Sequence, residues 1–259
     1  MPGEKPRGEG VPVLDNLRIV ILNCPYDTWE EAQTRDLFGA MAALKLRGYR
    51  DDYAYGVLPL DTTDFVGCHY LLCEDRPDGL QPIMGCRMVS LDRCRVHRLP
   101  FPALTLAAMA DAPRHAEAMR GIVERCERQG IGIVYDGSWT IDPQTRRERR
   151  LLHEIFTAMF VMVHDAYAIR ETIAGAVLRL KTARYLSSWG YRPLELDGAP
   201  LPPVAVQPLL GEPVTLMHLR EFTASARTVA DRYRALWERR LIIEASTAVP
   251  RTVTRSFCS

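Results

Sequence analysis

The chain has 259 residues, of which 47% are hydrophobic and 25% charged, and its formal net charge is +1. These values are typical of a soluble globular protein, and so small a net charge excludes a general electrostatic attraction to nucleic acid or to a membrane surface. No apolar run is long enough for a transmembrane helix, and the first residues lack the apolar core of a signal peptide. We therefore expect a cytoplasmic protein with no nucleic-acid partner and no membrane span.

The seven cysteines are scattered along the chain, and no two of them form a C-x-x-C pair. This spacing favours reduced thiols in the core over disulfides or a zinc site. His153 and His164 fall on much the same face of one predicted helix. A metal would need more ligands than these two histidines, so we expect no metal site.

The first predicted strand and helix follow a Pro- and Gly-bearing start. Residues 1–13 are expected to be a disordered tail, residues 14–241 one domain, and residues 242–259 a C-terminal tail. Leu17 to Asn23 is an apolar run typical of a strand. Asp27 and Thr28 can cap a helix that begins near Trp29, and Gly48 is expected to end it.

A β-hairpin is predicted next. Val66 to Cys73 and Ile83 to Leu91 are apolar runs joined by a polar turn, the pattern of paired strands. Arg87 lies inside the second run, where a charge is costly unless an acid pairs with it. Asp61 and Asp64 are the nearest acids, so the hairpin predicts a charged pocket at the edge of a sheet.

Helices and strands continue to alternate through the second half, which predicts a mixed α and β fold. The predicted helices cover residues 103–129 with a break at Pro113, residues 145–167, residues 179–188 and residues 222–237. The predicted strands cover residues 131–135 with an extension to 141, residues 169–177, residues 191–196 and residues 213–219.

Several short motifs occur in a fixed order between Gln33 and Leu219. They read Thr34-Arg35-Asp36-Leu37-Phe38, Asp61-Thr62-Thr63-Asp64 before His69-Tyr70-Leu71-Leu72, Gly85-Cys86-Arg87-Met88, Leu99-Pro100-Phe101, and Tyr185-Leu186-x-x-Trp189-Gly190-Tyr191. Each motif is short, and their order carries the inference. Together they resemble the GNAT acyltransferases, and among these the acyl-homoserine-lactone synthases and the N-acyl amino acid synthases.

The resemblance implies an α/β fold with a central, mostly antiparallel sheet that is flanked by helices and split in a V near Asp136 to Thr140. A helical extension would follow at the C-terminus. The implied activity is transfer of an acyl group from an acyl carrier protein or coenzyme A thioester to a small-molecule amine, with an amino acid as the expected acceptor. The acyl-coenzyme A or acyl-phosphopantetheine is then a substrate, and no permanently bound cofactor is expected.

The chain departs from the family pattern at three places, and the first two favour a second hypothesis. Asp136-Gly137-Ser138-Trp139-Thr140 stands where the family has Glu-x-Ser-Arg-Phe, so Trp139 replaces an arginine. The glycine-rich phosphate loop is absent, and Leu186 occupies a position where many relatives have a tyrosine. A GNAT-like module that binds acyl chains or a carrier protein without catalysis is therefore the alternative. A third reading is an acetyltransferase that acts on protein lysines.

Thioester-to-amine transfer needs a base for the amine proton and a backbone N–H for the carbonyl oxygen. Asp136 is the candidate base, or a group that orients the amine; the alternative is a solvated acid at a strand end. Ser138 to Thr140 would supply the N–H group if the strand separates from its neighbour here. The alternative is ordinary pairing within the sheet.

Two charged groups complete the predicted site. Arg146, Arg147, Arg149 and Arg150 open a predicted helix, where arginines and free N–H groups favour a bound phosphate; the alternative is a solvated basic turn. Tyr185 is assigned to the same donor site. Arg35, Asp61, Asp64 and Arg87, with Trp139, are expected to contact the amine substrate, and a purely structural ion network is equally consistent with the charged residues.

Overall fold

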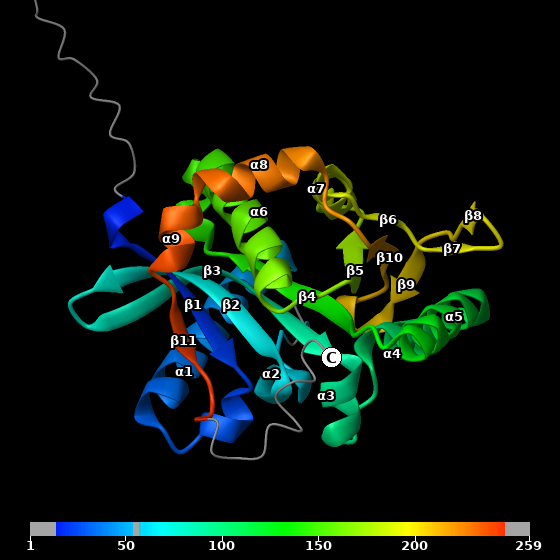
Figure 1. Cartoon of the computed structure of the whole chain (residues 1–259), viewed down its shortest axis with the longest axis horizontal. Coiled ribbons are helices and arrows are strands. Elements are labelled where there is room, and N and C mark those ends of the chain that lie inside the picture. The colour runs from blue at the N-terminus through cyan, green and yellow to red at the C-terminus, as the bar shows by residue number, and fades with distance from the viewer. Residues whose placement is uncertain (1–13, 54–56, 58, 247–259) are drawn as a thin grey trace, which may run out of the picture.

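The structure is a computed structural model that describes residues 14–53, 57 and 59–246, with the backbone alone for residues 146–149. Its main sheet has the strand order β11-β1-β2-β3-β4-β5-β10-β6, with β9 beside β10 (Figure 1). Only the pairs β1–β11 and β4–β5 are parallel. The strands of this sheet are β1 (Leu17–Asn23), β2 (Cys68–Arg76), β3 (Gly79–Ser90), β4 (Ile133–Ile141), β5 (Glu171–Val177), β6 (Arg192–Pro193), β9 (Val204–Val206), β10 (Glu212–Leu219) and β11 (Leu241–Ile243).

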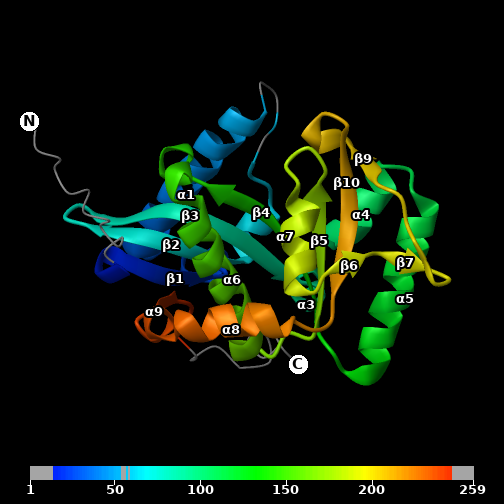
Figure 2. The same cartoon turned by 90° about the horizontal axis from the view of Figure 1, so that it is seen from above.

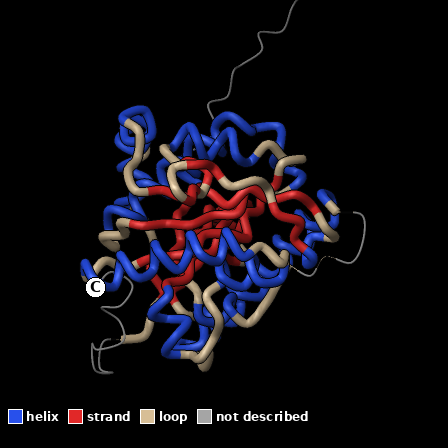
Figure 3. The backbone as a smooth tube through the Cα atoms, turned by 90° about the vertical axis from the view of Figure 1, so that its right-hand side faces the viewer, coloured by secondary structure: helices blue, strands red, loops and turns tan. Residues whose placement is uncertain are grey.

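Helices cover both faces of the sheet, so that it lies between two helical layers (Figure 3). One layer consists of α1 (Ala32–Asp52), α2 (Thr63–Val66), α3 (Leu91–Val96), α4 (Pro102–Met109) and α5 (Pro113–Gln129). The other consists of α6 (Arg149–Ala166), α7 (Thr182–Trp189), α8 (Ala224–Arg232) and α9 (Arg234–Glu238), with α8 lying across α6 (Figure 2). The larger hydrophobic core forms under α6. No described helix is long and apolar enough to cross a membrane.

The first helix differs from its prediction at both ends. It begins at Ala32 because Pro25–Thr28 forms a separate 3-10 turn, η2, and it continues past Gly48 to Asp52. Gly48 is needed for close packing: a Cβ there would lie 2.5 Å from Cγ2 of Thr140 on β4. The glycine therefore brings α1 against β4, and the prediction that it ends the helix was wrong.

Other predicted boundaries also change. Residues 191–196 form two short strands, β6 and β7 (Glu195–Leu196), and β7 pairs with β8 (Ala199–Pro200) instead of joining the main sheet. The predicted final helix divides at Tyr233 into α8 and α9. Ile242 and Ile243, expected in a tail, lie in β11 beside β1 and extend the sheet.

The sheet separates between β4 and β5, as predicted. These strands pair only from Ile133 to Asp136 on β4, opposite Glu171 to Ala174 on β5. On the β3 side, Ser138 and Trp139 both lie opposite Cys86, which makes a β-bulge. Ser138 has a φ of 56°, a left-handed conformation that few non-glycine residues adopt. The edge of β4 from Gly137 onward is therefore free of β5, and the predicted V-shaped split is confirmed.

Candidate active site

Asp136 lies fully buried at the last position of β4 that pairs with β5. Its Oδ1 accepts a hydrogen bond from the Tyr70 hydroxyl at 2.7 Å and from Cys86 Sγ at 2.8 Å. Its Oδ2 has no hydrogen-bond partner among the described residues. One oxygen is therefore fixed by two donors, and the other remains able to exchange a proton.

Strand register places these donors beside the carboxyl. Tyr70 on β2 and Cys86 on β3 are direct cross-strand partners, and Cys86 faces the bulge that follows Asp136. Burial raises the pKa of Asp136 to about 7, although hydrogen bonds from Cys86, Tyr70 and Trp139 act in the opposite direction. A carboxyl with a pKa near neutral pH can serve as a general base there.

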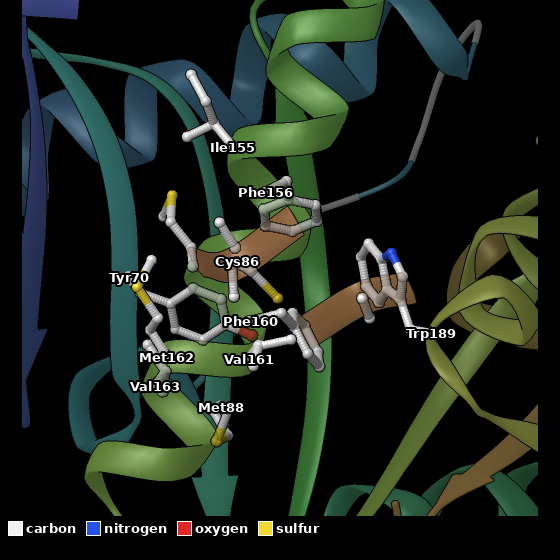
Figure 4. Close-up of a cluster of buried hydrophobic side chains, with 14 of the residues drawn as sticks. Tyr70, Cys86, Met88, Ile155, Phe156, Phe160, Val161, Met162, Val163 and Trp189 are labelled. Carbon is white, nitrogen blue, oxygen red and sulfur yellow. The ribbon is translucent and has the colours of Figure 1, made fainter. Parts of the chain in front are cut away.

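Aromatic side chains enclose this carboxyl on the α6 face of the sheet. Figure 4 shows Tyr70 and Cys86 beside Phe156 and Phe160, with Trp189 next to them. The ring of Trp139 lies 5.3 Å from that of Trp189, centroid to centroid, so β4 and α7 touch across the end of the gap. Such a lining excludes water and suits an apolar substrate group.

Tyr191 adds a second polar atom to this region. Its side chain is buried, its hydroxyl has no hydrogen-bond partner among the described residues, and it packs against Phe160. Burial, with the nearby Asp136 and Cys86, raises the pKa of Tyr191. Unpaired buried polar atoms are uncommon, and two of them close to one another are typical of a site that receives a polar group.

A charged cluster occupies the opposite face of the sheet. Arg87 is buried, and its guanidinium lies 2.8 Å from Asp61 Oδ1 and 2.9 Å from Asp64 Oδ2. Lys45 on α1 also pairs with Asp64. Burial raises the pKa of Asp64, but Arg87 and Lys45 outweigh it and lower the pKa to about 2. The expected meeting of Arg87 with the two aspartates is therefore present.

The turn before β2 builds this cluster. Asp61 Oδ1 accepts from the N–H of Thr63 at 2.7 Å, and Asp64 Oδ2 accepts from the N–H of Asp61 at 2.8 Å. Gly67 leaves room for Arg87, because a Cβ there would lie 2.8 Å from Arg87 Cγ. Asp61 keeps 59% of its side chain exposed, whereas Asp64 is fully buried. Asp61 is thus the part of the cluster that a solute can reach.

Lys45 and His69 belong to the cluster but were not among the predicted site residues. Leu37, Met41 and Lys45 are spaced by four, which places the lysine on the buried face of α1 and is the signal that could have identified it. His69 Nε2 lies 2.7 Å from the carbonyl oxygen of Asp64, so it must donate. Burial and Lys45 lower the pKa of His69 to about 3, which keeps the imidazole neutral.

The two sites are adjacent across the sheet. Arg87 pairs with Gly137, the residue after Asp136, so the charged cluster and the buried carboxyl lie on opposite faces at one point of β4. Tyr135 spans the gap on the cluster side: Cβ atoms at Gly137 and Gly175 would lie 3.0 Å from its Cε1 and 3.3 Å from its hydroxyl. The two glycines allow this phenol to lie between β4 and β5.

Other predicted site residues lie elsewhere. Arg35 is exposed, and its Nη1 donates to the carbonyls of Trp29 at 2.9 Å and Glu30 at 2.6 Å, apart from the cluster. Thr140 faces α1 through Gly48, on the opposite side from Asp136, so the structure does not bring these two side chains together. Ser138 is half-buried within the bulge.

The predicted donor site is described only in part. Tyr185 stacks on His153 with ring centroids 4.2 Å apart, which joins α7 to α6. Arg150 is almost fully exposed and lies 3.6 Å from Glu154. The side chains of Arg146, Arg147 and Arg149 lie outside the described residues, and their backbone forms the 3-10 segment η3 (Pro143–Glu148) and the start of α6.

A cleft of about 1270 Å³ lies where β4 and β5 begin, lined by Ile131 just before β4 and by Glu171 at the start of β5. Its rim carries arginines, and buried Glu171 holds two of them, Arg125 at 2.9 Å and Arg220 at 3.3 Å. Tyr191 lines this cleft as well. The cleft therefore meets the buried carboxyl site at Tyr191, whose pKa is raised by burial and by the nearby Asp136 and Cys86.

No family model matches this sequence, and no curated protein sequence matches it. Among solved structures, the coenzyme A-dependent acyl-homoserine lactone synthase BjaI, with SAM and isopentyl-CoA, is similar over 93% of this chain and 98% of its own, at 13% identity and a TM-score of 0.51. FeeM, an N-acyl amino acid synthase from uncultured soil microbes, covers 83% of this chain and 97% of its own, at 11% identity and a TM-score of 0.45. The acyl-homoserine-lactone synthase LasI covers 88% and 98%, at 13% identity and a TM-score of 0.44. The chain therefore has a GNAT-like fold, in the arrangement that BjaI also has.

Proposed function

We propose that this protein is an acyltransferase that moves an acyl group from a coenzyme A or carrier-protein thioester to the amine of a small molecule, with an amino acid as the expected acceptor. The observation that carries the proposal is Asp136, a buried carboxyl with a pKa of about 7 and an unpaired Oδ2, at the point where β4 leaves β5. The fold shared with BjaI, which is described as coenzyme A-dependent, supports it.

The proposed reaction uses groups on β4, at the point where this strand separates from β5. The neutral amine attacks the thioester carbonyl carbon, a C–N bond forms, and the C–S bond breaks as the thiolate leaves with its electron pair. Asp136 Oδ2 takes the proton that the nitrogen loses, and a backbone N–H of the bulge at Ser138 or Trp139 stabilises the oxyanion. The thiolate takes a proton from water, and Asp136 then releases its own proton to solvent, which leaves a thiol and an amide and restores the carboxylate.

Each substrate has its own expected contacts. The exposed carboxylate of Asp61, fixed by Arg87, attracts the positively charged part of the acceptor. The acyl chain contacts the aromatic lining formed by Trp139, Phe156 and Trp189. The donor phosphates bind where α6 begins, at Arg146, Arg147, Arg149 and Arg150, because helix N-termini and arginines both favour phosphate.

The proposal is tested by incubating the purified protein with a panel of acyl-coenzyme A thioesters and amino acids. Thiol release that depends on the amine, together with an N-acyl product in the mass spectrum, is the expected result. Asp136→Asn should lose most of this release, and Asp36→Asn on the exposed side of α1 is the matched control. Thiol release that is independent of any amine, or equal in both variants, would contradict the proposal.

A non-catalytic acyl-binding module is the second candidate. The observation that favours it is the contact between Trp139 and Trp189, which closes the aromatic end of the gap at the position where the resembled family has an arginine. Native mass spectrometry separates the two. A module of this kind would retain an acyl ligand and release no thiol with any amine.

A further inference from the structure

Cys24, Asp27 and His97 bring three potential metal ligands together at a place remote from Asp136. Cys24 Sγ, a carboxylate oxygen of Asp27 and an imidazole nitrogen of His97 all lie within 4.8 Å of one another. We propose that these three side chains form a zinc site. No other set of three such ligands meets this spacing within the described part of the chain.

Local backbone structure fixes two of the ligands. Cys24 follows β1 in a left-handed conformation, with a φ of 51°, and its N–H donates to the carbonyl of Gly67 at 3.0 Å. The N–H of Asp27 donates to the carbonyl of Cys24 at 2.9 Å, which turns the carboxylate toward the thiol. The pair is therefore held in position by backbone hydrogen bonds that require no metal.

The third ligand comes from a segment more than seventy positions further along the chain, which is why no sequence spacing indicates this site. His97 ends α3, and its N–H donates to the carbonyl of Arg93 at 3.1 Å. Its ring packs edge-on against Tyr26, with centroids 5.6 Å apart. The contact with Tyr26 thus restricts the orientation of the imidazole.

The mixture of ligands identifies the metal class. Thiolate, imidazole and carboxylate are the three side chains that bind Zn²⁺, whereas Ca²⁺ and Mg²⁺ prefer oxygen alone. Cys24 is buried, Asp27 is exposed and His97 is half-buried, so the ion enters from the Asp27 side. Binding forms a Zn–S bond and releases the thiol proton to solvent, and a water molecule completes the tetrahedral coordination.

A metal here would connect elements that hold the charged cluster. Gly67, which accepts the Cys24 N–H, ends α2, the helix that contains Asp64. Arg93 on α3 donates to Asn23 at 2.8 Å and to the carbonyl of Val66 at 3.2 Å. These hydrogen bonds join the same elements that the proposed metal would join. The site therefore joins the end of β1 to the end of α3 beside α2, so metal binding would add to the contacts that hold these elements together.

The experiment uses the full-length chain without a histidine tag, stripped with a chelator and titrated with Co²⁺ as a spectroscopic probe. We expect one equivalent to give a thiolate-to-cobalt charge-transfer band and the visible bands of tetrahedral Co²⁺, and Zn²⁺ to abolish both. Zn²⁺ should also raise the Tm of the stripped protein. These readouts are independent of acyl transfer, so this proposal and the proposed function can fail separately.

Three variants decide the outcome, each checked for folding by circular dichroism. Cys24→Ser should lose the charge-transfer band, and His97→Gln, at a half-buried position that tolerates substitution better, should lose the rise in Tm with Zn²⁺. Cys126→Ser, which removes a buried thiol from α5, is the control and should retain both. A wild-type protein without the thiolate band, or a band that survives in Cys24→Ser, would overturn the proposal.

Discussion

At the scale of single residues, two aspartates on either face of β4 differ most in their acidity. Burial raises the pKa of Asp136 to about 7, and Arg87 with Lys45 lowers that of Asp64 to about 2 despite burial. Two carboxyls with pKa values of about 7 and about 2 are suited to different roles. Asp136 can exchange a proton at neutral pH, whereas Asp64 stays ionised and holds the charged cluster.

The raised pKa of Asp136 has a consequence for stability. Because the folded protein binds this proton more tightly than the unfolded chain, the stabilisation is complete below about pH 4 and is lost as the pH rises toward 7. A difference of about 3 in pKa corresponds to about 4 kcal/mol. Asp136→Asn should therefore unfold at a higher urea concentration than the wild type at about pH 8, and the difference should shrink at about pH 5. Equal midpoints at both pH values would contradict this, and Asp36→Asn controls for the loss of one charge.

Variants of Arg87 and Asp61 distinguish a structural role of the charged cluster from a role in substrate binding. Arg87→Ala would leave the fully buried Asp64 paired only with Lys45, at a cost of about 3–5 kcal/mol. Asp61→Ala removes a carboxylate that is 59% exposed, so most of the stability should remain. If Asp61 binds the acceptor, its variant melts near the wild-type temperature and loses kcat/KM for the amine. A variant with unchanged kcat/KM for every active amine would rule out this role.

The charged residues that need a partner can be recognised in the sequence, but not all of their partners can. An arginine inside an apolar strand predicts a nearby acid, and Arg87 does pair with Asp61 and Asp64. Tyr70 and Cys86 contact Asp136 only because β2, β3 and β4 align in one register. Such contacts depend on pairing between distant segments, which no local pattern of residues determines.

At the scale of elements, most helices and strands lie where hydrophobic periodicity places them, and the errors fall at their ends. Gly48 shows why: a glycine is a usual stop signal for a helix, yet here it permits close approach to Thr140. Similarly, β11 lies in the segment expected as a tail because β1 offers it a parallel edge. Both features depend on long-range packing.

The packing of α1 on β4 gives a prediction at this scale. Gly48→Ala improves helix propensity by about 1 kcal/mol, but its Cβ would lie 2.5 Å from Thr140 Cγ2. We expect this clash to dominate, so that the free energy of unfolding falls by about 1–3 kcal/mol. Thr140→Ser removes that methyl group and should restore much of the stability in the double variant. Gly39→Ala is the control, since a Cβ there meets nothing within 4 Å, and it should stabilise the protein. Strictly additive effects of Gly48→Ala and Thr140→Ser, measured by urea unfolding, would show that the contact is unimportant.

At the scale of the whole molecule, one split in the sheet opens a gap that connects its two faces. The pairing of β4 with β5 ends at Asp136, and the bulge at Ser138 and Trp139 turns the free edge of β4 into the gap. The charged cluster then lies on one side of the gap, and Asp136 with the aromatic lining lies on the other. The order of motifs predicted this split, but the position of Tyr135 between two glycines required the three-dimensional structure.

The role of Asp136 as the base can be measured through the pH dependence of kcat/KM for the amine, in the wild type and in two variants of the buried carboxyl site. If Asp136 is the base, wild-type kcat/KM rises with an apparent pKa near 7, and Tyr70→Phe moves this rise to higher pH because it removes a hydrogen bond that lowers the pKa of Asp136. Asp136→Asn should lose about 10²–10⁴-fold in kcat/KM and the rise itself. A wild-type profile without this rise, or an Asp136→Asn variant with wild-type kcat/KM, would contradict the central claim.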